Sequence, residues 1–273
     1  MIEKIKSIFA EFSLPLGVAP FREVNIRQTD VGYKTVLMTY IPYFYHAKKD
    51  ATLCLYSTLP DYHDYFKEKL EPVKNRLGSE FSGFRFDIFA DNSPINEKKA
   101  AIISGLGSVG KNSLLITEKH GSFVVLGEIL TDLEVTSTAA EPKDVCKSCD
   151  RCAKACPAGA IRPDRTVDID RCLSAITQKK GELSAEEAAL LEKNGLIWGC
   201  DCCQSCCPHN LTLKDSEYGA SAKKIYDIAP DEIENLSDRE FKEKYRGYAF
   251  TWRGKNTILR NIKIVNGAKN SKK

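Results

Sequence analysis

Apolar residues recur with helical and strand periods through the first half of the chain. In residues 2–12 isoleucine and phenylalanine return every three or four positions, and residues 61–77 repeat this spacing in a polar background. Both segments therefore predict amphipathic helices. Residues 36–41 form a short apolar run that ends at a proline, and residues 84–89 alternate with a period of two, so each predicts a strand.

Local signals predict further elements in this half. Ser93 followed by Pro94 is typical of a serine cap with proline at the first helical position, so we expect a helix over residues 94–104. Residues 114–116 and 122–129 predict two strands joined by a short turn. The first half of the chain thus mixes helices with strands.

The second half has a different composition. A Thr, Ser and Ala-rich stretch at residues 136–142 predicts a linker, and residues 184–194 predict a helix. Acidic side chains gather in residues 231–243, whereas residues 244–273 carry nine Lys or Arg and no Asp or Glu. We therefore expect three regions, namely a domain over residues 1–135, a second over 136–215, and a C-terminal helical segment with a basic tail over 216–273.

Composition excludes several classes of protein. With 42% hydrophobic and 28% charged residues, the 273-residue chain has enough apolar side chains for a packed core. The net charge of +3 does not by itself indicate a polyanionic partner. The charged N-terminal residues do not resemble a signal peptide, and no apolar run approaches the ~18 residues of a membrane span. We expect a soluble cytoplasmic protein.

Eleven cysteines are the most informative feature, and ten of them fall between Cys146 and Cys207. This clustering is unlike the disulfide framework of a secreted domain and indicates a metal or cluster site in a reducing compartment. The first group runs Cys-x2-Cys-x2-Cys-x3-Cys-Pro from Cys146 to Pro157, which is the spacing of bacterial ferredoxins. The second group ends in a matching Cys-Pro pair at Cys207.

Eight of these cysteines fit two [4Fe–4S] clusters with crossed ligation, since the fourth cysteine of a ferredoxin run ligates the other cluster. We expect one cluster to take Cys146, Cys149, Cys152 and Cys207, and the other to take Cys156, Cys172, Cys200 and Cys203. Zinc also uses Cys-x2-Cys pairs, and disulfides are a second alternative. Cys202 and Cys206 are left over and could replace neighbouring ligands by a shift of one residue.

A glycine-rich segment, Gly-Leu-Gly-Ser-Val-Gly at residues 105–110, matches the fingerprint of dinucleotide-binding folds. That fingerprint must follow a strand and open a helix, whereas here it follows a predicted helix and precedes predicted strands. We therefore interpret Gly105 as a helix stop and do not expect NAD or FAD here. A close approach to another bulky cofactor stays open.

Together these residues resemble the epoxyqueuosine reductase family of cobalamin-dependent, two-cluster enzymes, from about residue 50 to residue 260. Besides the cysteines, the resemblance rests on short motifs: Asp61-Tyr62-His63, Asp91-Asn92-Ser93-Pro94, the loop over residues 105–112, Leu126-Gly127-Glu128, Trp252-Arg253-Gly254 and Leu259-Arg260-Asn261. It implies an α+β fold, in which a mixed α/β cobalamin-binding domain precedes a ferredoxin-like double [4Fe–4S] domain.

The resemblance also implies a reaction and its partners. Epoxyqueuosine at the wobble position of a tRNA would lose its epoxide oxygen, with base-off cobalamin reduced through the two clusters. The partners would be the tRNA and an external low-potential electron donor, without a membrane. We expect a monomer.

Two catalytic residues follow from the same resemblance. Asp91 is the expected proton donor, and Cys54 is expected near the cobalamin. The plain structural alternatives are a helix cap near Pro94 for Asp91 and a small core residue for Cys54. Further candidates for the cobalamin pocket are Lys111, Asn112, Leu126, Gly127 and Glu128, although Lys111 also fits a solvated surface lysine. The Asp-x-His-x-x-Gly signature of histidine-ligated cobalamin fails because Phe66 replaces the glycine.

The chain departs from the family at the expected tRNA contact. Relatives commonly continue past the Leu-Arg-Asn motif into a helical-repeat extension that helps to hold the anticodon stem, whereas this sequence stops at Lys273. We expect the basic segment to contact phosphates instead, through Arg253, Lys255, Arg260 and Lys263. An ordinary charged terminus is the alternative.

Two other functions stay open from the sequence. One is a corrinoid iron–sulfur reductase for a different small substrate. The other is a ferredoxin-like electron carrier without cobalamin, which would have no need of the first 135 residues.

Overall fold

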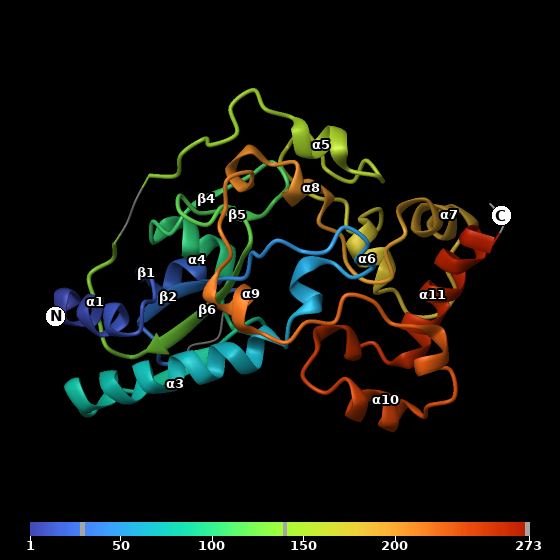
Figure 1. The fold of residues 1–273 in the computed structure, drawn as a ribbon. Helices are drawn as coiled ribbons and strands as arrows, with labels where there is room; N and C mark the ends of the chain where they lie inside the picture. The colour runs from blue at the N-terminus through green and yellow to red at the C-terminus, as the bar shows by residue number, and fades with distance from the viewer. Residues whose placement is uncertain (28–30, 139–140, 271–273) are drawn as a thin grey trace. The chain divides into compact units, whose positions relative to one another are not determined.

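The computed structural model describes residues 1–27, 31–138 and 141–270 and is drawn as a ribbon in Figure 1. The chain forms two compact units. Unit 1 comprises Met1–Pro42, His63–Gly110 and Leu114–Lys147, and unit 2 comprises Tyr43–Tyr62, Lys111–Ser113 and Ser148–Lys273. Two segments from the N-terminal half of the chain therefore belong to the C-terminal unit.

A four-stranded antiparallel sheet is the centre of unit 1. Its order is β1, β2, β6, β3, with bounds Gly17–Pro20, Thr35–Pro42, Val124–Thr131 and Phe86–Phe89. β2 and β6 pair along their full length, so that Thr35 lies opposite Thr131. Every residue of β2 except the last is buried. This burial explains why the strand appears in the sequence as a largely apolar run rather than as an alternation.

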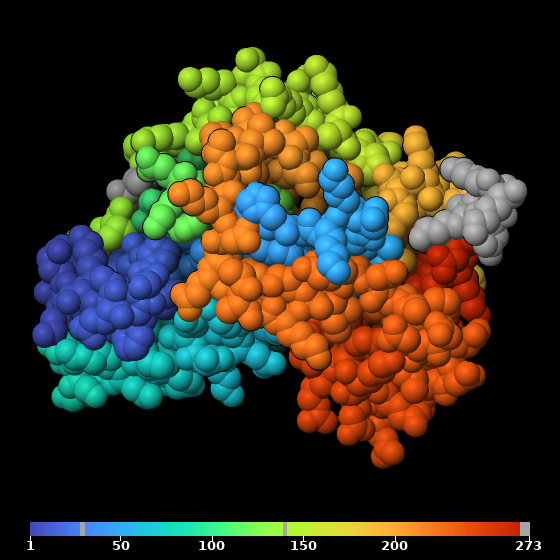
Figure 2. Space-filling view, in the orientation of Figure 1, coloured from blue at the N-terminus to red at the C-terminus, as the bar shows by residue number. Residues whose placement is uncertain are grey.

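Two long helices lie along one face of this sheet. The ring of Phe66, from α3 (Tyr62–Glu80), covers Gly127 of β6, where a Cβ would lie 2.6 Å from the ring. Beside α3 lies α1 (Ile2–Glu11), and Figure 2 shows this blue helix against the teal one. Ion pairs join the two helices, namely Lys4 with Glu80 and Arg76 with Glu11. Both helices were predicted from their periodicity.

The opposite face of the sheet is covered by α4 (Glu97–Ile103), with α2 (Phe21–Val24) at its edge. Ala100 and Ala101 of α4 pack against the side chains of β2 and β6 that point this way. Successive residues of a strand face opposite sides, so Glu128, between Gly127 and Ile129 in β6, points toward α4. The sheet therefore lies between two helical layers, which confirms the predicted mixed α/β architecture.

The start of α4 differs from the prediction of a helix over residues 94–104 with Ser93 as its cap. The helix begins three residues later, and the side chain of Asn96 caps it by accepting a backbone N–H of the first turn. The Pro94 carbonyl instead accepts the N–H of Ile26 at 3.0 Å. Pairing with a distant segment therefore overrides the local capping signal.

The two predicted strands of residues 114–116 and 122–129 are both present, but they lie in different sheets. The strand β5 (Leu115–Ile116) pairs with β4 (Ser108–Val109) in a separate two-stranded sheet, whereas β6 joins the main sheet. The partner strand lies inside the glycine-rich segment, where no strand was predicted. Because residues 108–109 pair with β5, β5 is not available to pair with β6.

The glycines of residues 105–110 have structural roles. Gly105 follows the C-cap of α4 with φ of +82°, which confirms it as the helix stop. A Cβ on Gly107 would lie 2.6 Å from the Ile116 carbonyl oxygen, so the close approach of β4 to β5 requires glycine. The segment follows a helix and leads into a strand. A dinucleotide fingerprint instead follows a strand and opens a helix, so this order agrees with the interpretation of Gly105 as a helix stop.

Unit 2 is built from short helices and loops, apart from the last helix (Figure 1). Its helices are α5 (Arg151–Ala155), α6 (Leu173–Thr177), α7 (Ala185–Asn194), α8 (Cys202–Ser205), α9 (Glu217–Ser221), α10 (Asp238–Lys244) and α11 (Lys255–Asn270). Single 3-10 turns lie at Leu55–Thr58, Pro208–Asn210, Pro230–Glu232 and Ala249–Thr251. The predicted helix over residues 184–194 is confirmed, with Ser184 in a capping box.

One hydrophobic core joins segments that were predicted to lie in three domains. Leu53 and Trp198 pack with Phe241, Phe250 and Ile258, so the C-terminal segment is not a separate region. The structure also places the division between the units at Lys147 rather than at residue 135. Part of the predicted linker is bound within unit 1, because the Thr138 N–H donates to the Val18 carbonyl at 3.0 Å. Residues 139–140 lie outside the described residues.

In the described parts of the chain, no helix has both the length and the apolar character needed to cross a membrane.

Candidate functional site

All eleven cysteines are free thiols, so the disulfide alternative is not realised. A structural zinc ion needs four ligands around one point, and within the described residues no group of three or more Cys, His, Asp or Glu converges in this way. A [4Fe–4S] cluster instead binds its four cysteines through separate irons, which suits a wider spacing of thiolates. The donor set in unit 2 therefore fits iron–sulfur clusters better than zinc.

Two short helices bring cysteines of the two groups together. The helix α5 carries Cys152 and packs against α8, which carries Cys202 and Cys203. The Cys203 thiol lies within electrostatic reach of Cys152 and Cys172. Burial is the main cause that raises the pKa of Cys203 to about 12. Because an iron ligand must lose this proton, cluster binding would be coupled to deprotonation.

The ligand assignment stays a prediction. The Cys203 thiol lies near Cys172, expected in the same cluster, and also near Cys152, expected in the other, so this contact does not decide the assignment. The spare Cys206 lies near Cys149 and Cys152, which are expected ligands of the other cluster. A shift of one residue, from Cys207 to Cys206, is therefore still open for that cluster.

Cys54 belongs to unit 2 with every clustered cysteine except Cys146, which belongs to unit 1 together with Asp91. The Cys54 N–H donates to the Trp198 carbonyl at 2.9 Å. Its sulfur packs against Gly199, where φ is +70° and an added Cβ would overlap the Sγ. Burial raises the pKa of the Cys54 thiol. The residue is thus a neutral, buried thiol. It contacts Gly199, the residue that directly precedes Cys200.

Buried hydrogen bonds tie this segment to the last helix. The Asn261 side chain, fully buried in α11, donates to the carbonyls of Thr177 and Ile197 at 2.7 and 2.8 Å. The Thr177 hydroxyl in turn accepts the Gly199 N–H at 2.8 Å. The position of Cys200 therefore depends on an amide from the Leu-Arg-Asn motif. No local pattern in the sequence indicates this role, because the partners lie far apart along the chain.

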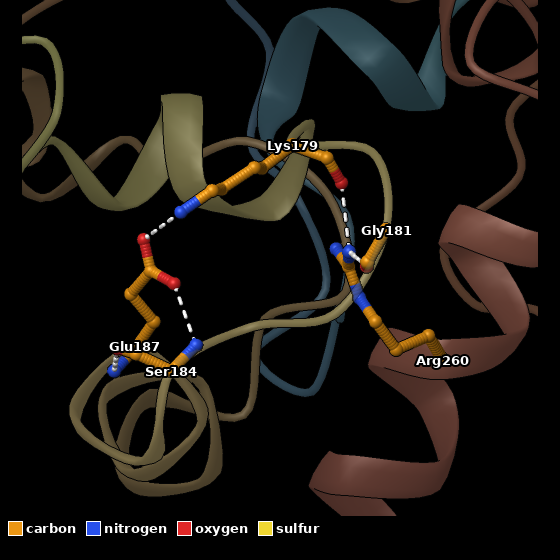
Figure 3. Close-up of polar contacts among 5 residues, drawn as sticks. All are labelled: Lys179, Gly181, Ser184, Glu187 and Arg260. Atoms are coloured by element: carbon orange, nitrogen blue, oxygen red, sulfur yellow. Dashed lines mark hydrogen bonds and ion pairs between the residues drawn. The ribbon is translucent and has the colours of Figure 1, made fainter.

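Arg260, expected to face nucleic acid, directs its guanidinium into unit 2. Figure 3 shows it donating to the carbonyls of Lys179, at 2.7 Å, and Gly181. The same loop is closed by Lys179 and the Ser184 N–H, each 2.8 Å from the Glu187 carboxylate. Arg260 therefore fixes α11 to this loop, and its contact with nucleic acid stays a prediction.

The other three basic candidates have different surroundings. Lys255 donates to backbone carbonyls, and Lys263 pairs with Glu234 at 3.5 Å. The Arg253 guanidinium lies over the ring of Trp252, 3.5 Å from its centroid, and Trp252 is 57% exposed. The exposed Trp252 ring is thus covered on one face by the half-buried Arg253.

Asp91 lies in the loop after β3 with φ of +56°. This left-handed conformation is uncommon for residues with a side chain and is often found at functional sites. Its carboxylate lies 3.3 Å from Nε2 of His63 in α3, and both side chains are about half exposed. Because Asn96 caps α4, the capping alternative for Asp91 is not realised.

A cavity of about 530 Å³ opens beside His63 in unit 1. Its lining combines the rings of Phe66 and Phe89 with the amines of Lys67 and Lys74. The volume is within the usual range for small-molecule sites. Glu71 and Asp87 also line it, so its walls are aromatic and carry charges of both signs, which suits a flat polar ring.

Behind Asp91 lies the buried carboxyl group of Glu128. The sequence indicated Glu128 only as a candidate contact to cobalamin. Glu128 has no exposed surface, and neither of its oxygens makes a hydrogen bond of normal geometry within the described residues. Glu97, at the start of α4, lies beside it and was not predicted at all. Its position in the first helical turn gave no signal beyond an ordinary acidic N-terminus.

The other residues predicted to contact cobalamin are divided between the units. Lys111 and Asn112 belong to unit 2, where Lys111 donates to the Cys149 carbonyl at 2.8 Å and Asn112 contacts the Cys203 thiol. Leu126 is half-buried in β6, and Phe66 covers Gly127. These positions therefore serve the cysteine region and the sheet, and their contact with a cofactor stays a prediction.

Comparison with known proteins agrees with this arrangement. A family model for a 4Fe-4S double cluster binding domain matches residues 145–210. The epoxyqueuosine reductase of Gloeobacter violaceus is 32% identical over 260 residues, which cover 90% of this chain and 80% of that protein. The enzyme of the same name from Bacillus subtilis is 34% identical over 215 residues, covering 76% of this chain but only 54% of the relative.

A solved structure shares the fold. The crystal structure of an epoxyqueuosine reductase with an epoxyqueuosine-modified tRNA-Tyr stem loop superposes with a TM-score of 0.84 at 24% identity. It covers 98% of this chain and 81% of that chain.

Proposed function

This chain belongs to the epoxyqueuosine reductase family, and we propose that it reduces the epoxide of epoxyqueuosine in tRNA to the alkene of queuosine. The observation that carries the proposal is the match with the Gloeobacter reductase, which extends over 260 residues and includes both units. The free cysteines in double-cluster spacing support it as the means of supplying electrons.

The reaction must take up two electrons and two protons. Both C–O bonds of the epoxide break, a C=C bond forms, and the oxygen leaves as water. An external donor of low potential would supply the electrons through the two clusters, one at a time.

Asp91 is our candidate for the acid that protonates the departing oxygen. Its carboxyl is half exposed, so it is accessible to a substrate, and His63 at 3.3 Å orients it. A carboxyl acts in this way only when its environment holds the proton near neutral pH. The cavity beside His63 would receive the modified base.

Cobalamin is the further cofactor that the family resemblance implies, and when bound it supplies low-valent cobalt chemistry. The residues predicted to hold it fit this role poorly, because Gly127 lies under Phe66 and both Glu128 and Asn112 are buried. We therefore derive no step through it, and its binding is a separate question for experiment.

The tRNA contact is proposed for the exposed Trp252 and the half-buried Arg253 beside it in unit 2. Stacking of a base on this pair would add to phosphate contacts from Lys263 and other basic side chains. A Trp252→Ala substitution should weaken tRNA binding at every salt concentration. Lys263→Ala should instead reduce the salt dependence of binding.

The decisive experiment is anaerobic reconstitution with iron, sulfide and cobalamin, followed by reaction with epoxyqueuosine-containing tRNA and analysis of its nucleosides. We expect queuosine to form with wild-type protein. We expect Asp91→Asn to retain its iron and form none. About eight irons per chain support two [4Fe–4S] clusters, whereas about four would contradict them.

Two other results would replace the proposal. Corrin retained without queuosine formation would favour a different small substrate for the same chemistry. No corrin retained, with reversible cluster reduction, would favour an electron carrier.

A further inference from the structure

The buried carboxyl of Glu128 needs a physical explanation. It lies in β6 between Met38 of β2 and Phe89 of β3, on the face covered by α4. Neither oxygen makes a hydrogen bond of normal geometry within the described residues. An ionised carboxylate in such a place is strongly unfavourable, whereas the protonated form is much less so. The site therefore favours a proton on this group.

Glu97 makes this site a carboxyl pair. Burial and the nearby charge of Asp91 raise the pKa of Glu97 to about 7, and burial and Glu97 raise the pKa of Glu128 well above its ordinary value. Two carboxyl groups held side by side out of water do not both ionise near neutral pH. One proton shared between them satisfies both.

The pair also contacts the loop that carries the candidate acid. The backbone N–H of Asp91 points to the Glu97 carboxyl. This contact holds the residue whose φ lies in the left-handed region. Glu97 is thus next to the Asp91 loop, and Glu128 lies behind it in the sheet.

We propose that Glu97 and Glu128 share one proton at neutral pH, position the Asp91 loop, and return a proton to Asp91 after it has protonated the departing oxygen. The inference rests on the proposed function, in which each epoxide consumes two protons. When Asp91 gives up its proton, the pair transfers one to it, and the half-buried Glu97 regains a proton from solvent. The two electrons come from the external low-potential donor. Glu97 and Glu128 are positioning residues, since neither contacts the substrate.

Some of the charged and polar groups around the pair raise the pKa values of the two glutamates, and others lower them. Asp91 raises the pKa of both glutamates. His63, from α3, lowers the pKa of Glu97, and the Ser93 hydroxyl lowers the pKa of Glu128. From α4 itself, Lys99 is directed away, since its amine donates to the Glu23 carbonyl at 2.6 Å. Burial is the largest cause of the raised pKa in both glutamates.

Infrared spectroscopy of the reconstituted protein in heavy water tests the shared proton without turnover. We expect a protonated-carboxyl band at pH 6 that weakens as the pH rises through about 7, the raised pKa of Glu97. The band should lose intensity at pH 6 in Glu128→Gln and in Glu97→Gln, because each variant lacks one of the two carboxyl groups. It should persist in Glu134→Gln, which removes an exposed carboxylate shortly after β6. A wild-type protein without this band, or a band that both substitutions leave intact, would overturn the shared proton.

Turnover tests the return of the proton to Asp91. In Glu97→Gln and Glu128→Gln, kcat should fall by at least about tenfold with KM nearly unchanged, and its pH dependence near 7 should disappear. Glu134→Gln should match wild type in both. Wild-type kcat and pH dependence in both pair variants would overturn the relay. If the band is present but wild-type protein reduces no epoxyqueuosine, the proposed function fails while the shared proton stands.

Discussion

The two units hold their reactive groups by different means. In unit 1 the register of a four-stranded sheet places Glu128, and a helix start places Glu97 beside it. In unit 2 short helices and loops carry all the cysteines except Cys146, and individual side chains such as Asn261 and Thr177 tie the loops together. The glutamates of unit 1 are thus held by many repeated backbone hydrogen bonds of a sheet, whereas the cysteines of unit 2 are held by a few specific side-chain contacts. Single substitutions should therefore disturb unit 2 more.

The largest effect is expected from Gly199→Ala in unit 2. The new Cβ would require a left-handed residue and would overlap the Cys54 sulfur, so we expect a loss of about 3 kcal/mol or more in stability. The control is Gly195→Ala, which has φ of +67° but no atom within 4 Å of the added Cβ. It should lose about 1–2 kcal/mol by denaturant unfolding. Equal losses would contradict the close packing of Cys54.

The Asn261→Ala substitution should have the next largest effect. It leaves the buried carbonyls of Thr177 and Ile197 without their donor, which should destabilise unit 2 by roughly 2–4 kcal/mol and lower its iron content. Asn256→Ala, at an exposed position of the same helix, should change neither. Amide exchange should rise around Gly199 in the first variant. Unchanged exchange there would show that the amide is dispensable.

In unit 1, Gly127→Ala tests packing against the regular sheet. Its Cβ would lie 2.6 Å from the Phe66 ring, so α3 must shift, at a cost of about 1–3 kcal/mol. Gly78→Ala in α3, with no atom within 4 Å, should instead stabilise by about 0.5–1 kcal/mol. Thermal unfolding of both variants measures the difference. A stable Gly127→Ala protein would mean that Phe66 does not seal this face.

The smallest effect is expected from Glu128→Gln, which should alter how the free energy of unfolding depends on pH. Folded wild-type protein retains a proton that the unfolded chain releases above about pH 4.5, because the pKa of Glu97 is raised from 4.5 to about 7. Its stability should therefore fall as the pH rises between these values. The variant lacks the Glu128 carboxyl, whose own pKa is raised by burial, so this fall should shrink. Urea unfolding at pH 5 and pH 8, with Glu134→Gln as control, tests this, and parallel behaviour of all three proteins would contradict it.

Much of the fold follows from local patterns. The helices near residues 2–12 and 61–77 and the strand over residues 36–41 were predictable because each carries its own periodicity. The cap of α4 was not, since Ser93 and Asn96 offer equally good local signals and only the bond from Ile26 to Pro94 distinguishes them. Short-range signals fail where a distant segment decides between two local solutions.

The candidate site divides in the same way. The sequence by itself determined the cysteine spacing and the helix stop at Gly105, because both depend on residues within a few positions of one another. Only the tertiary structure decided that Cys54 packs on Gly199, that Glu97 faces Glu128, and that Arg260 binds its own chain. The physical reason is that burial and hydrogen bonding join residues from segments far apart, and the period of a single segment carries no information about its partner.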